Sequence, residues 1–146
     1  MRRLALLVLI TAVAGCGGGD QRQSGKQKKG LSLSVSFGEP LRTGRPVTWK
    51  LTVENGGPDR ATLVFRSGQD GDAALVQGGR EAYRWSKSRY FTQAMRQVQL
   101  EPGERKTFTL EEKELSAEPG DYELVAELDS EPTPPPARRA VTVKSR

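Results

Sequence analysis

Histidine is absent from this 146-residue chain, and cysteine occurs only once, at Cys16. Histidine is the commonest general base and the commonest metal ligand in proteins, so its absence excludes Ser-His-Asp and Cys-His catalytic arrangements. A single cysteine cannot form an intramolecular disulfide, and a thiolate metal site is equally unexpected. We therefore predict a protein that is not an enzyme and that has neither a cofactor nor a bound metal.

Acidic side chains are the remaining candidates for catalysis or metal binding, and their pattern does not indicate a catalytic or calcium-binding site. Asp121 and Glu123 are two residues apart in an expected strand, which is the spacing of a solvent-facing side. The loop at residues 69–72 (QDGD) offers oxygen ligands but lacks the bidentate glutamate of a twelve-residue calcium loop. We read this loop as a polar turn.

The chain also lacks an apolar run long enough to span a bilayer, because residues 4–14 give only eleven residues where about 20 are needed. Two arginines precede this run and small residues follow it, which is the layout of a secretory signal peptide. Residues 13–16 (VAGC) resemble the bacterial lipobox. That resemblance implies cleavage after Gly15, lipid attachment at Cys16 and an extracytoplasmic protein anchored to the cell membrane. The alternative is an ordinary cleaved signal followed by a chance cysteine.

Residues 17–30 (GGGDQRQSGKQKKG) contain no apolar side chain, so residues 16–30 are predicted to be a lipidated cysteine followed by a basic, flexible tether. The net charge of +5 comes from the N-terminal 30 residues, because the 17 basic and 17 acidic residues that follow cancel. A neutral folded part does not indicate a nucleic-acid partner.

From residue 31 onward, apolar residues alternate with polar ones, which indicates half-buried strands. Strands are expected at residues 31–37, 47–54, 61–66, 73–77, 81–86, 97–100, 106–110, 122–128 and 140–144, with Leu63 and Phe65 facing inward. Turn signals separate them, and residues 131–139 read as an extended proline-rich loop. We predict that residues 31–146 form an all-β, immunoglobulin-like antiparallel sandwich of about eight strands.

Several motifs occur in a distinctive order: LTVEN at 51–55, FRSGQ at 65–69, YRWSKSRYFTQAM at 83–95, LEPGERKTF at 100–108 and PGDYEL at 119–124. Together they resemble the BsuPI-type intracellular proteinase inhibitor domain. The resemblance covers roughly residues 45–130 and implies an immunoglobulin-like fold and inhibition of a subtilisin-type serine protease. Here SGQ is followed by DGDAA, where the family usually has an aromatic-rich segment.

The best candidate for a protein-binding surface is the irregular stretch that holds Lys87, Arg89, Tyr90, Phe91 and Met95. Aromatic residues beside arginine are typical of binding hot spots. Phe91 or Met95 is the expected choice for a subtilisin-type pocket, whereas Trp85 is expected in the core. The excess of basic residues here would favour an acidic partner, or would pair with the acidic region at residues 111–131.

Two functions follow from these observations. The first is a lipid-anchored, non-catalytic protein-binding domain whose partner is an exported protease. The second is a structural or assembly module of the cell envelope with no inhibitory activity.

Overall fold

The computed structural model describes residues 30–146, which contain ten β-strands and one short 3-10 turn, η1 (Trp85–Ser88). The strands are β1 (Leu31–Ser36), β2 (Leu41–Arg42), β3 (Val47–Asn55), β4 (Ala61–Phe65), β5 (Gly71–Gln77), β6 (Arg80–Arg84), β7 (Arg96–Leu100), β8 (Arg105–Glu112), β9 (Gly120–Leu128) and β10 (Ala137–Lys144). The predicted signal peptide, the lipidated Cys16 and the tether up to residue 29 lie outside the described residues.

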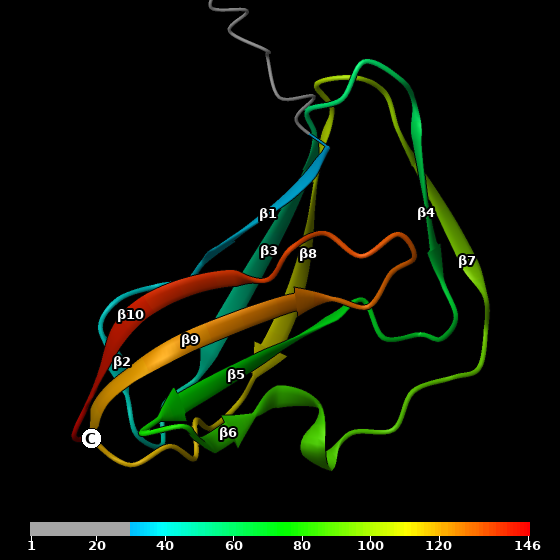
Figure 1. Cartoon of the computed structure of the whole chain (residues 1–146). Helices are drawn as coiled ribbons and strands as arrows, with labels where there is room; N and C mark the ends of the chain where they lie inside the picture. The colour runs from blue at the N-terminus through cyan, green and yellow to red at the C-terminus, as the bar shows by residue number, and fades with distance from the viewer. Residues whose placement is uncertain (1–29) are drawn as a thin grey trace, which may run out of the picture.

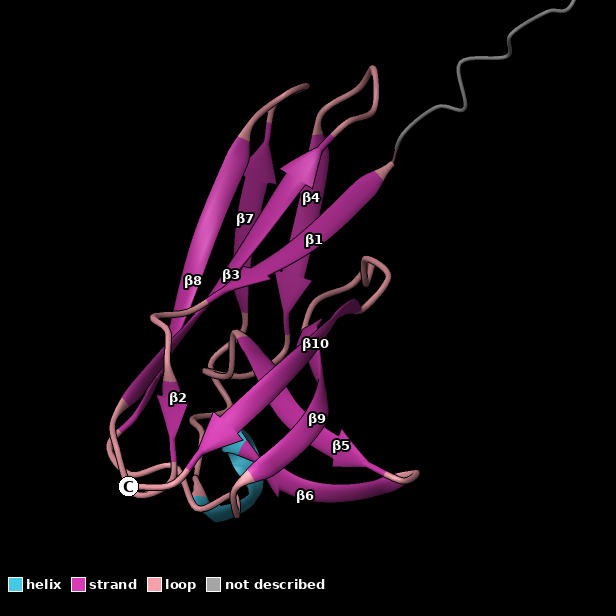
Figure 2. Ribbon diagram, turned by 90° about the vertical axis from the view of Figure 1, so that its left-hand side faces the viewer, coloured by secondary structure: helices cyan, strands magenta, loops and turns pink. Residues whose placement is uncertain are grey.

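Two sheets face each other and enclose the core (Figure 1, Figure 2). One has the order β1-β3-β8, and the other has the order β2-β10-β9-β5-β6. A third, two-stranded sheet joins β4 to β7. Neighbouring strands are antiparallel, except that β2 runs parallel to β10. This arrangement confirms the predicted all-β, immunoglobulin-like sandwich.

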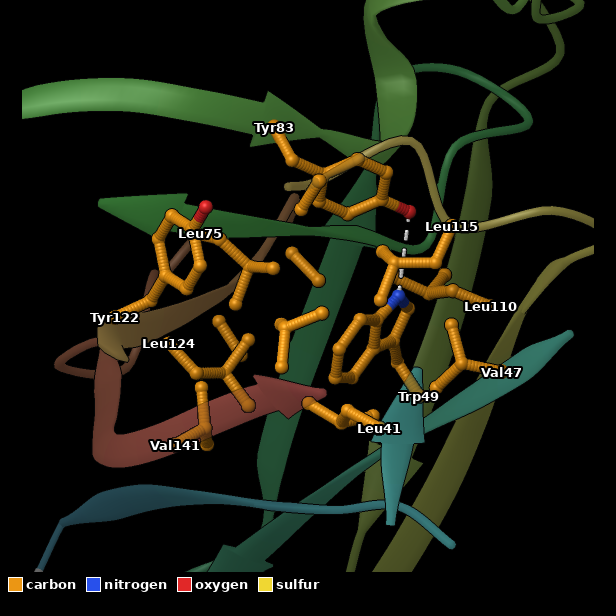
Figure 3. Close-up of a cluster of buried hydrophobic side chains, with 14 of the residues drawn as sticks. Leu41, Val47, Trp49, Leu75, Tyr83, Leu110, Leu115, Tyr122, Leu124 and Val141 are labelled. Atoms are coloured by element: carbon orange, nitrogen blue, oxygen red, sulfur yellow. Dashed lines mark hydrogen bonds between the residues drawn. The ribbon is translucent and has the colours of Figure 1, made fainter. Parts of the chain in front are cut away.

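The main hydrophobic core lies between the two larger sheets (Figure 3). Trp49 and Leu51 reach it from β3, while Leu75 and Leu124 reach it from β5 and β9, and all four are fully buried. They come from alternate positions of their strands, which is why the period of two in the sequence marks the buried face. The core therefore follows directly from that alternation.

One polar contact inside this core ties the two sheets together. The Trp49 indole Nε1 donates a 3.4 Å hydrogen bond to the Tyr83 hydroxyl, which in turn donates to Glu112 Oε2 at 2.9 Å (Figure 3). Burial raises the pKa of Tyr83 well above its usual value. The hydroxyl is therefore neutral and serves as a hydrogen-bonding bridge between β6 and the edge strand β8.

A second hydrophobic cluster fills the end of the sandwich beside β4 and β7. Leu63 and Phe65 are fully buried there, as predicted, and the Phe65 ring lies 5.3 Å from that of Phe108. Leu100 closes the cluster from β7. This packing fixes the position of β7 and hence one end of the segment that precedes it.

Most strand boundaries lie within two residues of those expected, and three differences from the sequence expectations matter most. The strand expected at residues 81–86 ends at Arg84, because Trp85 and Ser86 turn into η1. The last strand begins at Ala137, so it includes part of the stretch expected to be loop. The two-residue β2 was not predicted, and with it the described chain has ten strands rather than about eight.

The chain enters the sandwich at the opposite end from η1 (Figure 1, Figure 2). Leu31 pairs with Asn55 at one end of β3, and η1 lies at the other end of the domain, below β5 and beside β6 in Figure 1. Between residues 30 and 146, no helix is long and apolar enough to cross a membrane.

Candidate functional site

The candidate binding segment, residues 87–95, begins in the last two residues of η1 and runs without regular structure from residue 89 to the start of β7. Tyr90 is fully exposed, with a relative exposure of 102%, and Met95 is 63% exposed. Lys87 is exposed, whereas Arg89 and Phe91 are half-buried. The structure thus places Lys87 within η1, groups Arg89, Tyr90 and Phe91 directly after it, and leaves Met95 at the far end of the segment, next to β7.

Asp72 of β5 holds the beginning of this segment in place. This carboxylate is only 8% exposed and accepts hydrogen bonds from the Ser86 backbone N and hydroxyl, while Arg84 Nη1 lies 2.9 Å away in an ion pair. The Ala73 backbone N, at 2.9 Å, completes the set of donors. Because a buried carboxylate must be fully satisfied, these contacts fix the turn from β6 into η1.

Arg84 connects this carboxylate to the surface. Its guanidinium also contacts Glu81 Oε2 at 2.8 Å. The hydrogen bonds to Glu81 and then to Asp72 raise the pKa of Arg84, and the bond from Arg84 lowers the pKa of Glu81. The arginine is therefore permanently charged and committed to these two partners.

Arg89 pins the middle of the segment against the edge of the sandwich. Its Nε donates to the Trp85 carbonyl, and its Nη2 donates to the Glu111 carbonyl, both at 3.0 Å. The guanidinium carbon also lies 4.4 Å from the centre of the Trp85 ring, in cation–π contact. Nη2 is 3.4 Å from Glu112 Oε2, so Arg89 joins η1 to β8 by several bonds at once.

Trp85 contacts both of the residues that flank Tyr90. Its indole nitrogen donates to the Glu111 carbonyl at 3.0 Å, and its ring lies 5.7 Å from the Phe91 ring. It is half-buried at the margin of the main core, so the expectation of a core residue is met only at the core's edge. Arg89 and Phe91, which flank Tyr90, therefore both rest on the same side chain.

The end of the segment is held by the loop that precedes β5. The Gly68 backbone N donates to the Thr92 carbonyl at 2.8 Å. A Cβ at Gly68 would lie 2.6 Å from Thr92 Oγ1, so a side chain there would push the two loops apart. Glycine at this position therefore permits the close approach of the loops.

Most of the basic residues around the segment are already paired within the sandwich. Arg84 pairs with Asp72, Arg89 pairs with Glu112, and Arg96 Nη2 lies 2.8 Å from Asp70 Oδ1. The last contact is ionic rather than a well-angled hydrogen bond, since that Asp70 oxygen has no hydrogen-bond partner among the described residues. Of the expected pairings with residues 111–131, only that of Arg89 with Glu112 is present in the part of the chain described.

The loop at residues 69–72 is occupied by protein contacts rather than arranged as a ligand cradle. Asp72 is directed to Arg84 and Ser86, and Gln69 Nε2 donates to the Gly71 carbonyl at 3.1 Å. In residues 30–146 no group of three or more acidic, cysteine or histidine side chains is placed to hold a metal ion.

No local sequence pattern marks the residues that anchor the segment. Asp72 lies 14 positions before its partner Ser86, and Gly68 lies 24 positions before its partner Thr92, so both contacts depend on the packing of β5 and its preceding loop beside the segment. The sequence shows Trp85 only as an aromatic residue, and its contacts with Arg89 and Phe91 depend on the turn that follows Arg84. Such contacts become visible only once the fold is known.

The family model described as BsuPI, intracellular proteinase inhibitor, matches residues 38–133, more than half of the chain. The chain belongs to this family. The family description is that of an inhibitor rather than an enzyme, which agrees with the prediction from the missing histidine. No curated protein matches the chain.

Several solved structures are similar to the chain at low sequence identity. The sporulation control protein Spo0M from Bacillus subtilis is 14% identical with a TM-score of 0.51, and the match covers 81% of this chain and 51% of Spo0M. A CARDB domain from Pyrococcus furiosus, determined in complex with di-metal ions, is 18% identical with a TM-score of 0.45, covering 80% of this chain and 94% of that domain. A β-glucosidase from Erythrobacter marinus is 16% identical with a TM-score of 0.45, covering 77% of this chain and 15% of the enzyme.

Proposed function

We propose that this protein is a non-catalytic, membrane-anchored inhibitor that binds a subtilisin-type serine protease outside the cytoplasm through residues 87–95. The observation that carries the proposal is that Tyr90 is fully exposed while the residues on either side of it, Arg89 and Phe91, are held against the sandwich. Membership of a family described as proteinase inhibitors supports the same reading. The lipobox-like residues 13–16 supply the argument for the membrane location.

The pinning matters because each side chain or loop that must become ordered on binding reduces affinity. Many small inhibitors would solve this problem with disulfides, which a chain with one cysteine cannot form within itself. Here Asp72, Arg89 and Gly68 hold the two sides of the segment by hydrogen bonds. The segment is therefore ordered before it meets a partner, and its exposed tyrosine is of the residue type enriched at hot spots.

A titration of a panel of subtilisin-type proteases with a form of the chain that begins at Gly17 tests this function. We expect hydrolysis of a small chromogenic peptide to fall progressively as the protein is added. Mass spectrometry of the mixture is the control, because an intact inhibitor distinguishes true inhibition from competition by a good substrate. Unchanged hydrolysis at micromolar protein would rule out the inhibitor function.

A second experiment identifies the partner in native membranes. Cross-linking followed by affinity capture of the full-length protein is expected to recover a protease. Recovery of cell-envelope subunits without any protease would favour the alternative, a structural or assembly module.

A further inference from the structure

We infer that Tyr90 is the residue that enters the primary specificity pocket of the partner protease, so that the peptide bond between Tyr90 and Phe91 faces the catalytic serine. This inference rests on the proposed function and adds the contact residue and the class of protease. It commits to a protease whose pocket accepts a large aromatic side chain.

Exposure separates Tyr90 from the other candidates on the segment. Tyr90 and Met95 are the large apolar side chains that the described residues leave exposed, at 102% and 63%. Phe91, one of the two residues that the sequence suggested, is half-buried with its ring 5.7 Å from that of Trp85. Phe91 would have to leave this contact to reach a pocket, whereas Tyr90 has no such contact to break.

Position in the chain separates Tyr90 from Met95. Met95 directly precedes Arg96, which is already paired with Phe65 in the β4–β7 sheet. A protease cleft receives an extended peptide with residues on both sides of the scissile bond, much as a sheet edge receives an added strand. The residues that follow Met95 are already paired in β7, so they cannot bind a protease cleft as an extended peptide. Tyr90 lies outside any sheet and follows Arg89, whose backbone is extended at φ −119° and ψ 150°.

The residues on either side of Tyr90 are held by the body of the domain. On its N-terminal side, Arg89 bonds to the carbonyls of Trp85 and Glu111. On its C-terminal side, Phe91 packs on the Trp85 ring and the Thr92 carbonyl accepts a bond from Gly68. Tyr90 therefore projects from a short stretch of backbone whose flanking residues, Arg89 and Phe91, both contact Trp85.

This geometry explains how a segment with the shape of a substrate can act as an inhibitor. Attack by the catalytic serine on the Tyr90 carbonyl forms an ester, breaks the C–N bond and releases the amine of Phe91. Water must then displace the serine to leave a carboxylate on Tyr90. Because Phe91 stays on Trp85, its amine remains next to the ester at high effective concentration, so re-formation of the peptide bond competes with hydrolysis.

Arg89 is a positioning residue in this scheme. It touches no part of the protease pocket in the proposed pose, and it acts by holding the backbone that precedes Tyr90 through Trp85 and Glu111. Within the specificity pocket itself, Tyr90 is the contact residue.

Inhibition constants measured with the full chain in mild detergent test the assignment. We expect Tyr90→Ala to weaken inhibition of an aromatic-accepting subtilisin-type protease by at least about 30-fold, the effect of losing a hot-spot side chain. Tyr90→Phe should stay within about threefold of the original. The matched control is Met95→Ala, an exposed apolar residue of the same segment, which should change inhibition by less than about threefold.

A change of specificity gives a second readout that a structural role would not produce. Tyr90→Lys should gain inhibition of a trypsin-type protease while losing that of the subtilisin-type enzyme. Prolonged incubation with excess protease should yield fragments that end at Tyr90 and begin at Phe91 in mass spectra.

The outcomes distinguish this inference from the proposed function. Equal inhibition by the original protein and Tyr90→Ala, or first cleavage at another bond, would overturn the assignment of Tyr90 and leave the inhibitor function standing. Absence of inhibition by the original protein across the whole panel would overturn both.

Discussion

At the scale of single residues, Asp72 is the side chain on which the candidate site most depends. It is a nearly buried carboxylate that joins β5 to Arg84 and to Ser86 at the start of η1. Its partners come from two different elements, so removal of the carboxylate affects the turn as well as the strand.

We expect Asp72→Ala to lower the free energy of unfolding by about 2–4 kcal/mol, because Arg84 and the Ser86 amide lose a charged, nearly buried partner. Glu81→Ala is the matched control, since it removes the exposed partner of the same arginine and should cost no more than about 1 kcal/mol. Urea denaturation measures both, and amide exchange at residues 85–92 should increase only for Asp72→Ala. Equal costs for the two variants would contradict this role for Asp72.

Tyr83 makes the stability of the sandwich sensitive to alkaline pH. Burial raises its pKa in the folded state above the value of about 10 expected when the chain is unfolded. A raised pKa means that the neutral hydroxyl's contribution is fully present below about pH 10 and is lost as the pH rises towards the folded-state pKa.

We therefore expect the melting temperature to fall more steeply above about pH 10 in the original protein than in Tyr83→Phe, which has no hydroxyl to ionise. Thermal unfolding followed by circular dichroism between neutral and alkaline pH measures the two slopes. Lysines and the other tyrosines ionise in both proteins, so the difference reports Tyr83. Parallel curves would show that Tyr83 does not titrate on unfolding.

At the scale of elements, strands β5 and β9 approach each other so closely at Gly71 that no side chain fits. A Cβ there would overlap the Glu127 carbonyl oxygen and would lie 2.8 Å from the Leu51 Cδ2 atom. Gly71 begins β5 and pairs with Leu128, directly after the loop that contacts the 87–95 segment. Glycine at this position thus sets the distance between two central strands.

Gly71→Ala should destabilise the protein by about 3 kcal/mol, the cost of overpacking against a backbone atom that cannot move away. Gly38→Ala is the control, because a Cβ at Gly38 meets nothing within 4 Å, and it should change stability by less than about 1 kcal/mol. Chemical denaturation of both variants gives the comparison. A small effect at Gly71 would mean that β5 and β9 separate easily.

The strands were predictable from the sequence to the extent that local alternation determines them. Nine strands could be predicted, because each has alternating or apolar residues or a clear turn beside it. The predicted bounds of β3 differ from the observed ones by a single residue. The two residues of β2 are too few to show a period, and they pair with residues of β10 that lie 102 positions away in the chain. Trp85 alternates correctly for a strand, yet the hydrogen bonds that Ser86 donates to Asp72 turn the chain there.

The candidate segment was found from composition, but the order within it was not. Aromatic and basic residues in an irregular stretch pointed to residues 87–95, and Tyr90 is indeed exposed. The sequence suggested Phe91 or Met95 for a protease pocket on hydrophobicity, a property that cannot reveal that Phe91 packs against the Trp85 ring. Which of two adjacent aromatic residues faces solvent depends on tertiary packing.

At the scale of the whole molecule, the prediction concerns the anchor. Cys16 lies outside the described residues, and its lipidation stays a prediction from the lipobox-like sequence. Cys16→Ser should move the protein from the membrane fraction to the soluble fraction, because it removes the acyl chains that would supply stable membrane anchoring. Fractionation and immunoblotting measure the distribution, with Ser24→Ala as a control that should stay in the membrane. A Cys16→Ser protein that remained in the membrane fraction would contradict the lipid anchor.

The opposite placement of Leu31 and η1 has a consequence for where an anchored protein would act. The nine residues of β3 span about 30 Å between those ends, since each strand residue advances about 3.4 Å. An anchor before Gly30 would therefore attach to the end of the domain opposite η1 and Tyr90. This placement would leave residues 87–95 open to proteases that approach from solution, on the side away from the attachment point.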